Sequence, residues 1–279
     1  MPDRADLTHA AARKALGQHF LFDPNILNRT ALAAGLLDGR HVIEIGPGPG
    51  GLTRAILDNG AASLTCVEAD ARFATALQAW PEAQAGRLYV LKGDARRVDW
   101  PSLPSVREAN QPVMIISNLP YNVGTPLLVT WLKAGNWRGE MALMFQKEVA
   151  QRVCARPGSR QYGRLAVLTA AVCDAAIAFT LPPGAFRPPP KVDSAVVVLK
   201  PLPPEHAFPA LAALETVVGA AFAQRRKMLR VALKPLAKSH RIDAEEWLKA
   251  CEIDPTARAE TLSQAQFRHL AIHFAGARR

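Results

Sequence analysis

Short apolar runs alternate with helix-spaced segments from about residue 25 to 200, and this alternation constrains the fold more than any other feature of the sequence. The runs that we expect to form strands are His41–Ile45, Ser63–Val67, Leu88–Leu91, Val113–Ser117, Met141–Phe145, part of Leu165–Phe179, and Ala195–Leu199. Strands that are separated by helices join through right-handed crossovers, which give a mostly parallel sheet. The later strands have shorter connections, so an antiparallel member fits the pattern. We therefore predict an α/β, Rossmann-like sheet.

Two proline-rich stretches follow this region. The first, L-P-P-G-A-F-R-P-P-P-K (181–191), predicts a rigid loop because proline fixes φ and has no N–H. The second, K-P-L-P-P-E (200–205), marks a domain boundary. The pattern after it is helical, and its apolar face comprises Leu211, Leu214, Val218, Phe222, Leu229 and Leu233. We expect a large domain over residues 1–200 and a small helical domain over residues 201–279.

The chain carries an excess of positive charge, with a formal net charge of +10 at pH 7. Such an excess suits a polyanionic partner, either nucleic acid or an acidic membrane surface. A basic soluble protein without such a partner fits the charge equally well.

The N-terminal residues contain no apolar run of the kind found in secretory signals, and Asp174 interrupts the longest apolar stretch, Leu165–Leu181. We therefore expect a cytoplasmic protein that does not bind to a membrane. The four cysteines form no C-x-x-C pair, and no H-E-x-x-H motif occurs, so we expect no metal site.

A glycine-rich loop, V-I-E-I-G-P-G-P-G-G-L-T (42–53), connects a strand to a helix start. From Gly46 onward it matches the G-x-G-x-x-G dinucleotide fingerprint, and Glu68 ends the next strand, where a ribose-binding acid is expected. However, Glu44 precedes the first glycine, and a carboxylate there would oppose a pyrophosphate. The E-x-G-x-G form resembles the nucleotide loop of S-adenosylmethionine methyltransferases, whose adenosyl ligand carries no phosphate.

Asp94 in G-D-A (93–95) follows the third strand. Its carboxylate is suited to accept a hydrogen bond from an adenine amine. A helix N-cap or a turn is the alternative role. Because the carboxyl ends of parallel strands share one edge of a sheet, we expect Gly46, Glu68 and Asp94 to line one pocket.

The tetrapeptide Asn118-Leu119-Pro120-Tyr121 ends the fourth strand on the same edge. An adenine amine is a poor nucleophile, because its lone pair is delocalised into the ring. The side-chain oxygen of Asn118 and the main-chain oxygen of Leu119, held by Pro120, are suited to accept its two N–H groups and draw the nitrogen towards tetrahedral geometry. Tyr121 offers a ring face for an unstacked base. On the tetrapeptide alone, a strand-ending turn with a packed tyrosine is the alternative.

N-L-P-Y resembles the catalytic motif of N6-adenine methyltransferases. The chain as a whole resembles the ribosomal RNA adenine N6,N6-dimethyltransferase family, and most closely its bacterial small-subunit (16S) members. The other segments that carry the resemblance are K-A-L-G-Q-H-F-L (14–21), V-E-A-D (67–70), Q-K-E-V-A-Q-R (146–152), Y-G-R-L (162–165), F-R-P-P-P-K-V-D-S (186–194) and F-A-Q-R-R-K-M-L-R (222–230). Their order and spacing together are highly specific.

This resemblance implies S-adenosylmethionine as the methyl donor. The residues that it implies as donor contacts are His19, Leu21, Gly46, Glu68, Asp94 and Asn118. Position 19 is asparagine in other members, so His19 departs from the pattern. The resemblance also implies that Phe186 is a second ring against the target base, with a core phenylalanine as the alternative.

The activity that the resemblance implies is dimethylation of two adjacent adenosines in a hairpin near the 3′ end of small-subunit rRNA, during small-subunit biogenesis. Residues 1–200 would form the catalytic domain, and residues 201–279 would dock on rRNA. The partner would be the pre-30S subunit, and no DNA is expected.

The C-terminal part contains a basic run, residues 222–241, with seven Lys and Arg residues and no acid. From it we predict an RNA-binding set of Arg225, Arg226, Lys227, Arg230 and Lys234. The spacing of Lys227, Arg230 and Lys234 is helical, and Pro235 should end or kink that helix. Such a run is suited to contact phosphates without reading sequence, and a solvated face is the alternative.

Three alternative functions fit parts of the pattern. A large-subunit (23S) rRNA adenine methyltransferase of the antibiotic-resistance type would share the pocket. A non-catalytic ribosome-assembly or transcription factor would share the fold but would not need N-L-P-Y. A nicotinamide-dependent dehydrogenase is favoured only by the glycine fingerprint.

Overall fold

The computed structural model describes residues 18–107 and 109–276, so residues 14–17 of the N-terminal motif lie outside it. The chain forms two compact units. The first comprises the residues up to 150 together with 176–200, and the second comprises 151–175 together with the residues from 201 onward. A break therefore falls at the expected boundary after residue 200. The division nevertheless differs from the predicted continuous domain 1–200, because residues 151–175 group with the C-terminal helices.

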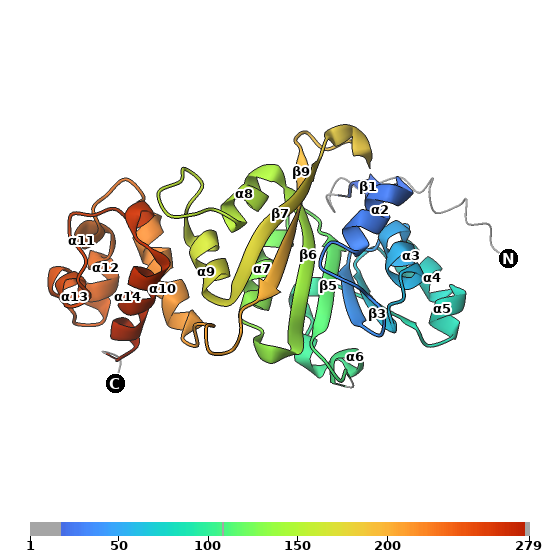
Figure 1. Ribbon diagram of the computed structural model, residues 1–279, viewed down its shortest axis with the longest axis horizontal. Helices are drawn as coiled ribbons and strands as arrows, with labels where there is room; N and C mark the ends of the chain where they lie inside the picture. The colour runs from blue at the N-terminus through green and yellow to red at the C-terminus, as the bar shows by residue number, and fades with distance from the viewer. Residues whose placement is uncertain (1–17, 108, 277–279) are drawn as a thin grey trace. The chain divides into compact units, whose positions relative to one another are not determined.

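Within the described residues, a seven-stranded sheet has the order β4-β3-β2-β5-β6-β9-β7. Its strands are β2 (His41–Ile45), β3 (Ser63–Glu68), β4 (Leu88–Lys92), β5 (Val113–Asn118), β6 (Arg138–Gln146), β7 (Cys173–Leu181) and β9 (Ser194–Pro201). Figure 1 shows them side by side, from β7 and β9 through β6 and β5 to β3. Strands β2 to β6 pair in parallel, and β9 pairs antiparallel with β6.

The strand order identifies the type of α/β fold. A dinucleotide-binding Rossmann sheet has the order 3-2-1-4-5-6. When the strands of this sheet are numbered in chain order from β2, their order across the sheet is 3-2-1-4-5-7-6. The last strand, β9, is therefore inserted between β6 and β7 and is antiparallel to β6. The central strands are buried on both faces, as crossovers with flanking helices require. The predicted Rossmann-like α/β fold with one antiparallel member is confirmed.

Helices flank this sheet. Those of the first unit are α2 (Pro24–Ala31), α3 (Gly51–Asp58), α4 (Ala71–Gln78), α5 (Pro81–Gln84), α6 (Pro104–Arg107) and α7 (Gly124–Leu132), with the 3₁₀ helices η2 (Ala95–Arg97), η3 (Trp100–Ser102), η4 (Gly135–Trp137) and η5 (Pro183–Ala185). Helix α8 (Lys147–Val153) crosses the break between the units. Helices α3 and α4 pack on β3, and α4 and α5 pack on β4.

A second, two-stranded sheet lies in the same unit, formed by β1 (Phe20–Leu21) and β8 (Phe186–Arg187). The two strands are antiparallel, with Leu21 opposite Phe186. This pairing ties the N-terminal segment to the proline-rich loop.

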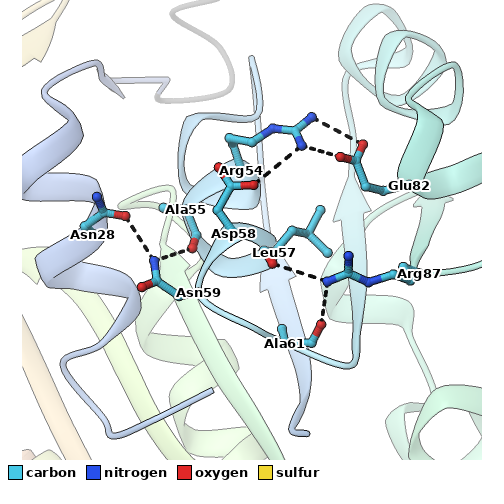
Figure 2. Close-up of polar contacts among 9 residues, drawn as sticks. All are labelled: Asn28, Arg54, Ala55, Leu57, Asp58, Asn59, Ala61, Glu82 and Arg87. Atoms are coloured by element: carbon cyan, nitrogen blue, oxygen red, sulfur yellow. Dashed lines mark hydrogen bonds and ion pairs between the residues drawn. The ribbon is translucent and has the colours of Figure 1, made fainter. Parts of the chain in front are cut away.

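Polar contacts fix helix α3, which follows the glycine loop (Figure 2). The Arg54 guanidinium forms an ion pair with Glu82 of α5. Nη2 of Arg87 donates to the main-chain oxygen of Leu57 in the last turn of the helix at 3.2 Å and to that of Ala61 just after it at 2.9 Å. These contacts hold α3, which packs on β3, and so they also hold the loop at its N-terminus.

The second unit is helical. Its helices are α9 (Arg164–Val172), α10 (Leu211–Ala223), α11 (Leu229–Ala232), α12 (Lys234–Ser239), α13 (Ala244–Ala250), α14 (Gln264–Gly276) and the 3₁₀ helix η6 (Ala259–Thr261). Helix α10 packs against α9 and α14, with the Phe222 ring 5.7 Å from that of Phe267 and 6.1 Å from that of Tyr162.

The predicted continuous helical face from Leu211 to Leu233 is wrong beyond α10. The helix ends at Ala223, the chain turns, and two short helices follow. Pro235 lies in the first turn of α12, where its missing N–H costs no hydrogen bond. In the described part of the chain, no helix combines the length and the apolar character needed to cross a bilayer.

Candidate active site

A cleft of about 210 Å³ opens in the first unit at the carboxyl ends of β2, β3, β4 and β5. Residues 18–20 form a further wall. The predicted site residues that line this cleft are His19, Gly46, Glu68, Asp94, Asn118, Leu119, Pro120 and Tyr121. The pocket that the strand-end argument predicts is therefore present, and the tetrapeptide belongs to it.

The glycine loop approaches other walls of the cleft too closely for side chains. Gly46 and Gly48 have φ values of +64° and +54°, in the left-handed region that glycine tolerates best. A Cβ atom at Gly46 would lie 3.3 Å from Cγ of Pro120, and one at Gly48 would lie 2.6 Å from Cε1 of Phe20. Phe20 is a cleft residue that the sequence analysis did not single out, and its ring packs edge-on against Phe73. The signal was an aromatic residue inside the matched N-terminal motif.

Glu68 presents an anchored carboxylate to the cleft. Its Oε2 accepts from the main-chain N–H of Gly48 at 3.0 Å, and its Oε1 accepts from that of Asp70 at 2.7 Å. The side chain is 3 % exposed. Burial raises the pKa of Glu68, and the two main-chain hydrogen bonds oppose that rise. These bonds fix the carboxylate at the end of β3.

Asp94 has the N-cap position that its sequence context allows and also lies at the cleft. It is the N-cap of η2, where its carboxylate accepts from the main-chain N–H of Arg96 at 2.9 Å, and it also lines the cleft. The Arg96 guanidinium pairs with the same carboxylate at 2.6 Å. Hydrogen bonds from Arg96 lower the pKa of Asp94 to about 2, so this residue is an ionised acceptor near neutral pH. Arg96 also lines the cleft and was not predicted to do so.

The orientation of the Asn118 amide is fixed by the N-terminal segment. Its Nδ2 donates to the main-chain oxygen of His19 at 2.9 Å. In an amide the nitrogen donates and the oxygen accepts. Because Nδ2 is the atom that faces His19, the contact distinguishes the two ends of the amide and leaves Oδ1 as the acceptor. Asn118 lines the cleft, and this contact fixes the orientation of its amide.

Tyr121 is held by contacts at its hydroxyl and its ring. The hydroxyl shares a hydrogen bond of 2.6 Å with Oγ of Ser194. The imidazole of His19 stacks on the ring, with centroids 5.5 Å apart and planes at 29°, and its Nδ1 contacts the main-chain oxygen of Pro188 at 2.8 Å. Burial raises the pKa of the Tyr121 phenol, which keeps the hydroxyl protonated.

Leu21 and Phe186 depart from their predicted roles. They face each other in the β1–β8 pair, are 5 % and 2 % exposed, and belong to the core of the first unit. Neither lines the cleft. A residue that stacks on a target base must be accessible, so in this conformation Phe186 adopts its alternative role as a core phenylalanine.

Glu44 also differs from the sequence argument. It is 2 % exposed, does not line the cleft, and accepts at Oε2 from Thr53 Oγ1 at 2.7 Å and Cys66 Sγ at 3.5 Å. Burial raises its pKa to about 8, so it is largely protonated near neutral pH. A neutral, buried carboxyl group does not repel a pyrophosphate, and that part of the argument fails. The carboxylate of the cleft is that of Glu68.

The predicted RNA-binding residues lie in the second unit, but not on one helix. Lys227 precedes α11 and Lys234 begins α12, so the helical spacing between them has no structural meaning. Arg225 pairs with Glu260 at 2.8 Å, and Arg230 pairs with Glu245 at 3.2 Å. The remaining three residues of the predicted set, Arg226, Lys227 and Lys234, are exposed.

Comparison with known proteins places this arrangement in a family. A family model described as ribosomal RNA adenine dimethylase matches residues 9–275. The chain belongs to the ribosomal RNA adenine dimethylase family. The family expected from the sequence motifs is therefore confirmed.

Similar proteins occur in several bacteria. The chain is 50 % identical to a ribosomal RNA small subunit methyltransferase A of Gluconobacter oxydans over 260 residues, which cover 93 % of this chain and 82 % of that protein. It is also 50 % identical to the protein of the same name from Agrobacterium fabrum over 264 residues, covering 93 % and 92 %.

Two solved structures share the fold of this dimethylase-family chain. One is a dimethyladenosine transferase from Plasmodium falciparum, with a TM-score of 0.75, 24 % identity and coverage of 93 % of this chain and 98 % of that one. The other is the 23S rRNA methyltransferase ErmE, with a TM-score of 0.65, 24 % identity and coverage of 92 % and 99 %. At these identities the likeness concerns the fold alone.

Proposed function

We propose that this chain transfers methyl groups from S-adenosylmethionine to N6 of two adjacent adenosines in a hairpin loop near the 3′ end of small-subunit (16S) rRNA. The observation that carries the proposal is that Asn118–Tyr121, Glu68 and Asp94 line the same cleft. The relatives that are about 50 % identical and are named small subunit methyltransferase A support this choice of RNA.

The cleft fits an adenosyl donor. Gly46 and Gly48 leave room for a ligand against the main chain, and Glu68 and Asp94 supply acceptors for ribose hydroxyls and for an adenine amine, respectively. Ile45 contributes an apolar wall. When bound, S-adenosylmethionine supplies an electrophilic methyl group on a positively charged sulfur.

The tetrapeptide acts on the target adenine. Oδ1 of Asn118 and the main-chain oxygen of Leu119 accept the two N–H groups of the amine, which localises the lone pair on nitrogen for in-line attack. Pro120 holds the Leu119 carbonyl and packs close to Gly46. No dedicated general base is needed, because the methylated ammonium is acidic and loses its proton readily. The contribution of the protein is positioning and electrostatics.

Tyr121 supplies an aromatic face for the extruded adenine, and its hydroxyl contact with Ser194 fixes the plane of the ring. Bases in a hairpin loop are already partly unstacked, so placing one in a pocket costs little free energy. A loop target therefore suits this cleft better than a paired one.

The second unit supplies RNA docking in this proposal. Arg226, Lys227 and Lys234 are exposed and suited to phosphate contacts, whereas acidic partners offset part of the charge of Arg225 and Arg230. The partner is the pre-30S subunit, and the reaction takes place in the cytoplasm during small-subunit assembly.

The alternative functions are less well supported. A large-subunit methyltransferase shares the fold, but the relatives at about 50 % identity carry the small-subunit name. A non-catalytic assembly factor would not need the oriented acceptor of Asn118. A dehydrogenase is disfavoured by the antiparallel strand in the sheet and by the family.

One incubation tests the proposal. Labelled S-adenosylmethionine and the protein are mixed with undermethylated small subunits and, separately, with undermethylated large subunits. We expect label in N6,N6-dimethyladenosine from the small subunits only. Label in the large subunits alone would refute the choice of RNA, and no label in either would refute the enzymatic activity.

A further inference from the structure

His19 lies where the N-terminal segment meets the proline-rich loop. In the β1–β8 pair, Phe20 is opposite Arg187, so the next position along the two chains sets His19 beside Pro188. Proline has no N–H with which to continue the ladder. The main-chain oxygen of Pro188 instead contacts Nδ1 of the imidazole at 2.8 Å. Since a carbonyl oxygen only accepts, Nδ1 carries the proton, and this hydrogen bond fixes the position of the ring.

Neighbouring side chains of this segment contact different walls of the cleft. The Phe20 ring lies against the glycine loop, 2.6 Å from the place that a Cβ atom of Gly48 would take. The imidazole of His19 lies on Tyr121 of the tetrapeptide. Such alternation is usual for an extended chain. In the proposed function the glycine loop is the donor side and the tetrapeptide is the base side, so the side chain of His19 contacts the base side.

The imidazole covers one of the two faces of the Tyr121 ring. The two centroids are 5.5 Å apart and the planes are inclined by 29°, which is within the range of stacked aromatic pairs. The hydroxyl of the same ring contacts Oγ of Ser194 at 2.6 Å. That hydroxyl lies on the axis about which a tyrosine ring turns, and rotation about this axis is soft. A stacked imidazole therefore adds a further resistance to turning of the Tyr121 ring.

We propose that His19 is a positioning residue for the target adenine: its imidazole occupies one face of Tyr121, restrains the plane of that ring and leaves the opposite face for the extruded base. This inference rests on the proposed function and deepens it, because it names the face of Tyr121 that the substrate uses. Phe186, the second ring that the resemblance implies, is buried in the core and does not line the cleft. The ring that supports Tyr121 is then the imidazole of His19.

The variant His19→Asn tests this role, because it removes the ring and keeps a polar side chain. It also keeps the main-chain oxygen that accepts from Asn118, so its effect reports on the side chain alone. With undermethylated small subunits and saturating S-adenosylmethionine, we expect kcat to fall about threefold to tenfold, as for the loss of one aromatic pair. KM for the subunits should stay within about twofold of the parent, since the residues proposed to dock RNA are unchanged.

Two further variants calibrate this result. His19→Phe keeps a ring against Tyr121 but lacks the Nδ1 donor, and we expect its kcat to be within about twofold of the parent. A titration with S-adenosylmethionine should give a Kd within about twofold of the parent for both variants of His19. His41→Asn is the matched control, because it removes a half-buried imidazole of the same unit that does not line the cleft, and it should keep the parent kcat. Thermal melting reports whether each variant is folded.

A double-mutant cycle separates positioning through Tyr121 from general support of the fold. Tyr121→Leu removes the ring on which the imidazole lies. Single-turnover methylation with labelled S-adenosylmethionine then measures the effect of His19→Asn in that background. If His19 acts through Tyr121, the added change should alter the rate by less than about twofold, whereas a structural role would give the same loss in both backgrounds.

The outcomes separate this inference from the wider proposal. A parent kcat in His19→Asn, with the parent protein methylating small subunits, overturns the inference and leaves the proposed function intact. The inference is also overturned by an equal loss in the Tyr121→Leu background, or by a raised Kd for S-adenosylmethionine at an unchanged kcat. Failure of His19→Phe to keep activity overturns it as well, since the ring is then not what acts. A parent protein that methylates no subunit defeats the proposed function itself.

Discussion

Nδ2 of Asn118 donates a hydrogen bond of 2.9 Å to the main-chain oxygen of His19, although 99 residues separate them in sequence. The contact links the end of β5 to the segment that precedes β1. It uses a main-chain acceptor, so it does not depend on the side chain at position 19. The amide that activates the target amine in our proposal is therefore oriented by the backbone, and either histidine or asparagine at position 19 can supply the same main-chain oxygen.

Replacing Asn118 by alanine should abolish turnover. The variant loses the acceptor for the target amine, and we expect kcat to fall by at least about 100-fold, as when one preorganised polar group is removed from an active site. Affinity for S-adenosylmethionine should fall only modestly. Single-turnover methylation and a titration with S-adenosylmethionine measure the two effects. Asn28→Ala is the control, because it removes an exposed amide of the first unit that does not line the cleft and should keep activity; an Asn118→Ala protein that turns over at the parent rate would exclude the acceptor role.

Replacing Gly48 by alanine should weaken donor binding and destabilise the first unit. The new Cβ would lie 2.6 Å from the Phe20 ring, at a φ of +54°. Gly86→Ala is the matched control, since Gly86 has a φ of +74° and no described atom within 4 Å of such a Cβ. The backbone cost common to both is about 1–2 kcal/mol of unfolding free energy. Urea unfolding should show a larger loss for Gly48→Ala, and Phe20→Ala in the same chain should remove the excess; equal losses in the two glycine variants would show that the Phe20 contact is unimportant.

The buried carboxyl of Glu44 should make stability depend on pH. The pKa of Glu44 is about 8 in the folded chain, whereas an ordinary glutamate has a pKa of 4.5. Between these pH values, the folded state binds one more proton at this residue than the unfolded state does. The unfolding free energy therefore falls as the pH rises from about 4.5 to about 8. The stabilisation that the extra proton contributes is complete only below this pH range. Glu44→Gln resembles the protonated group and should lack this fall, which is on the order of a few kcal/mol. Urea unfolding of both proteins at about pH 5 and pH 8 measures the difference; parallel pH profiles would mean that Glu44 is ionised in the fold.

Phe186 should behave as a core residue. Its ring is 2 % exposed, so Phe186→Ala should cost about 3–5 kcal/mol of unfolding free energy, and Phe186→Leu about 1 kcal/mol. Methylation by the folded Phe186→Leu protein should stay close to that of the parent. The contrary result is a large fall in kcat/KM with little change in stability, which would mean that the ring leaves the core to stack on the target base.

Much of the fold was predictable because strands in a parallel sheet are continuous apolar runs. The run His41–Ile45 coincides with β2. The sequence from Leu165 to Phe179 did not reveal where a helix ends and a strand begins. A buried helix and a buried strand are both apolar, and short apolar runs show no periodicity that tells them apart. This stretch contains most of α9, which ends at Val172, and most of β7, which begins at Cys173.

The site was predictable where function follows from position along the sheet edge. Gly46, Glu68 and Asp94 end successive strand–loop segments, so parallel geometry alone brings them together. The roles of Leu21 and Phe186 were not predictable in this way, because their pairing joins segments 165 residues apart and buries both side chains. The grouping of residues 151–175 with the C-terminal helices likewise depends on long-range packing that no local pattern encodes.

The most direct test of the central claim is to map the methylated nucleotides by mass spectrometry. Undermethylated small subunits are incubated with the protein and S-adenosylmethionine, and the RNA is digested into fragments. Our account predicts N6,N6-dimethyladenosine at two adjacent positions in one hairpin loop near the 3′ end, and none with the Asn118→Ala protein. Methylation at other atoms or other sites, or unchanged methylation by Asn118→Ala, would contradict it.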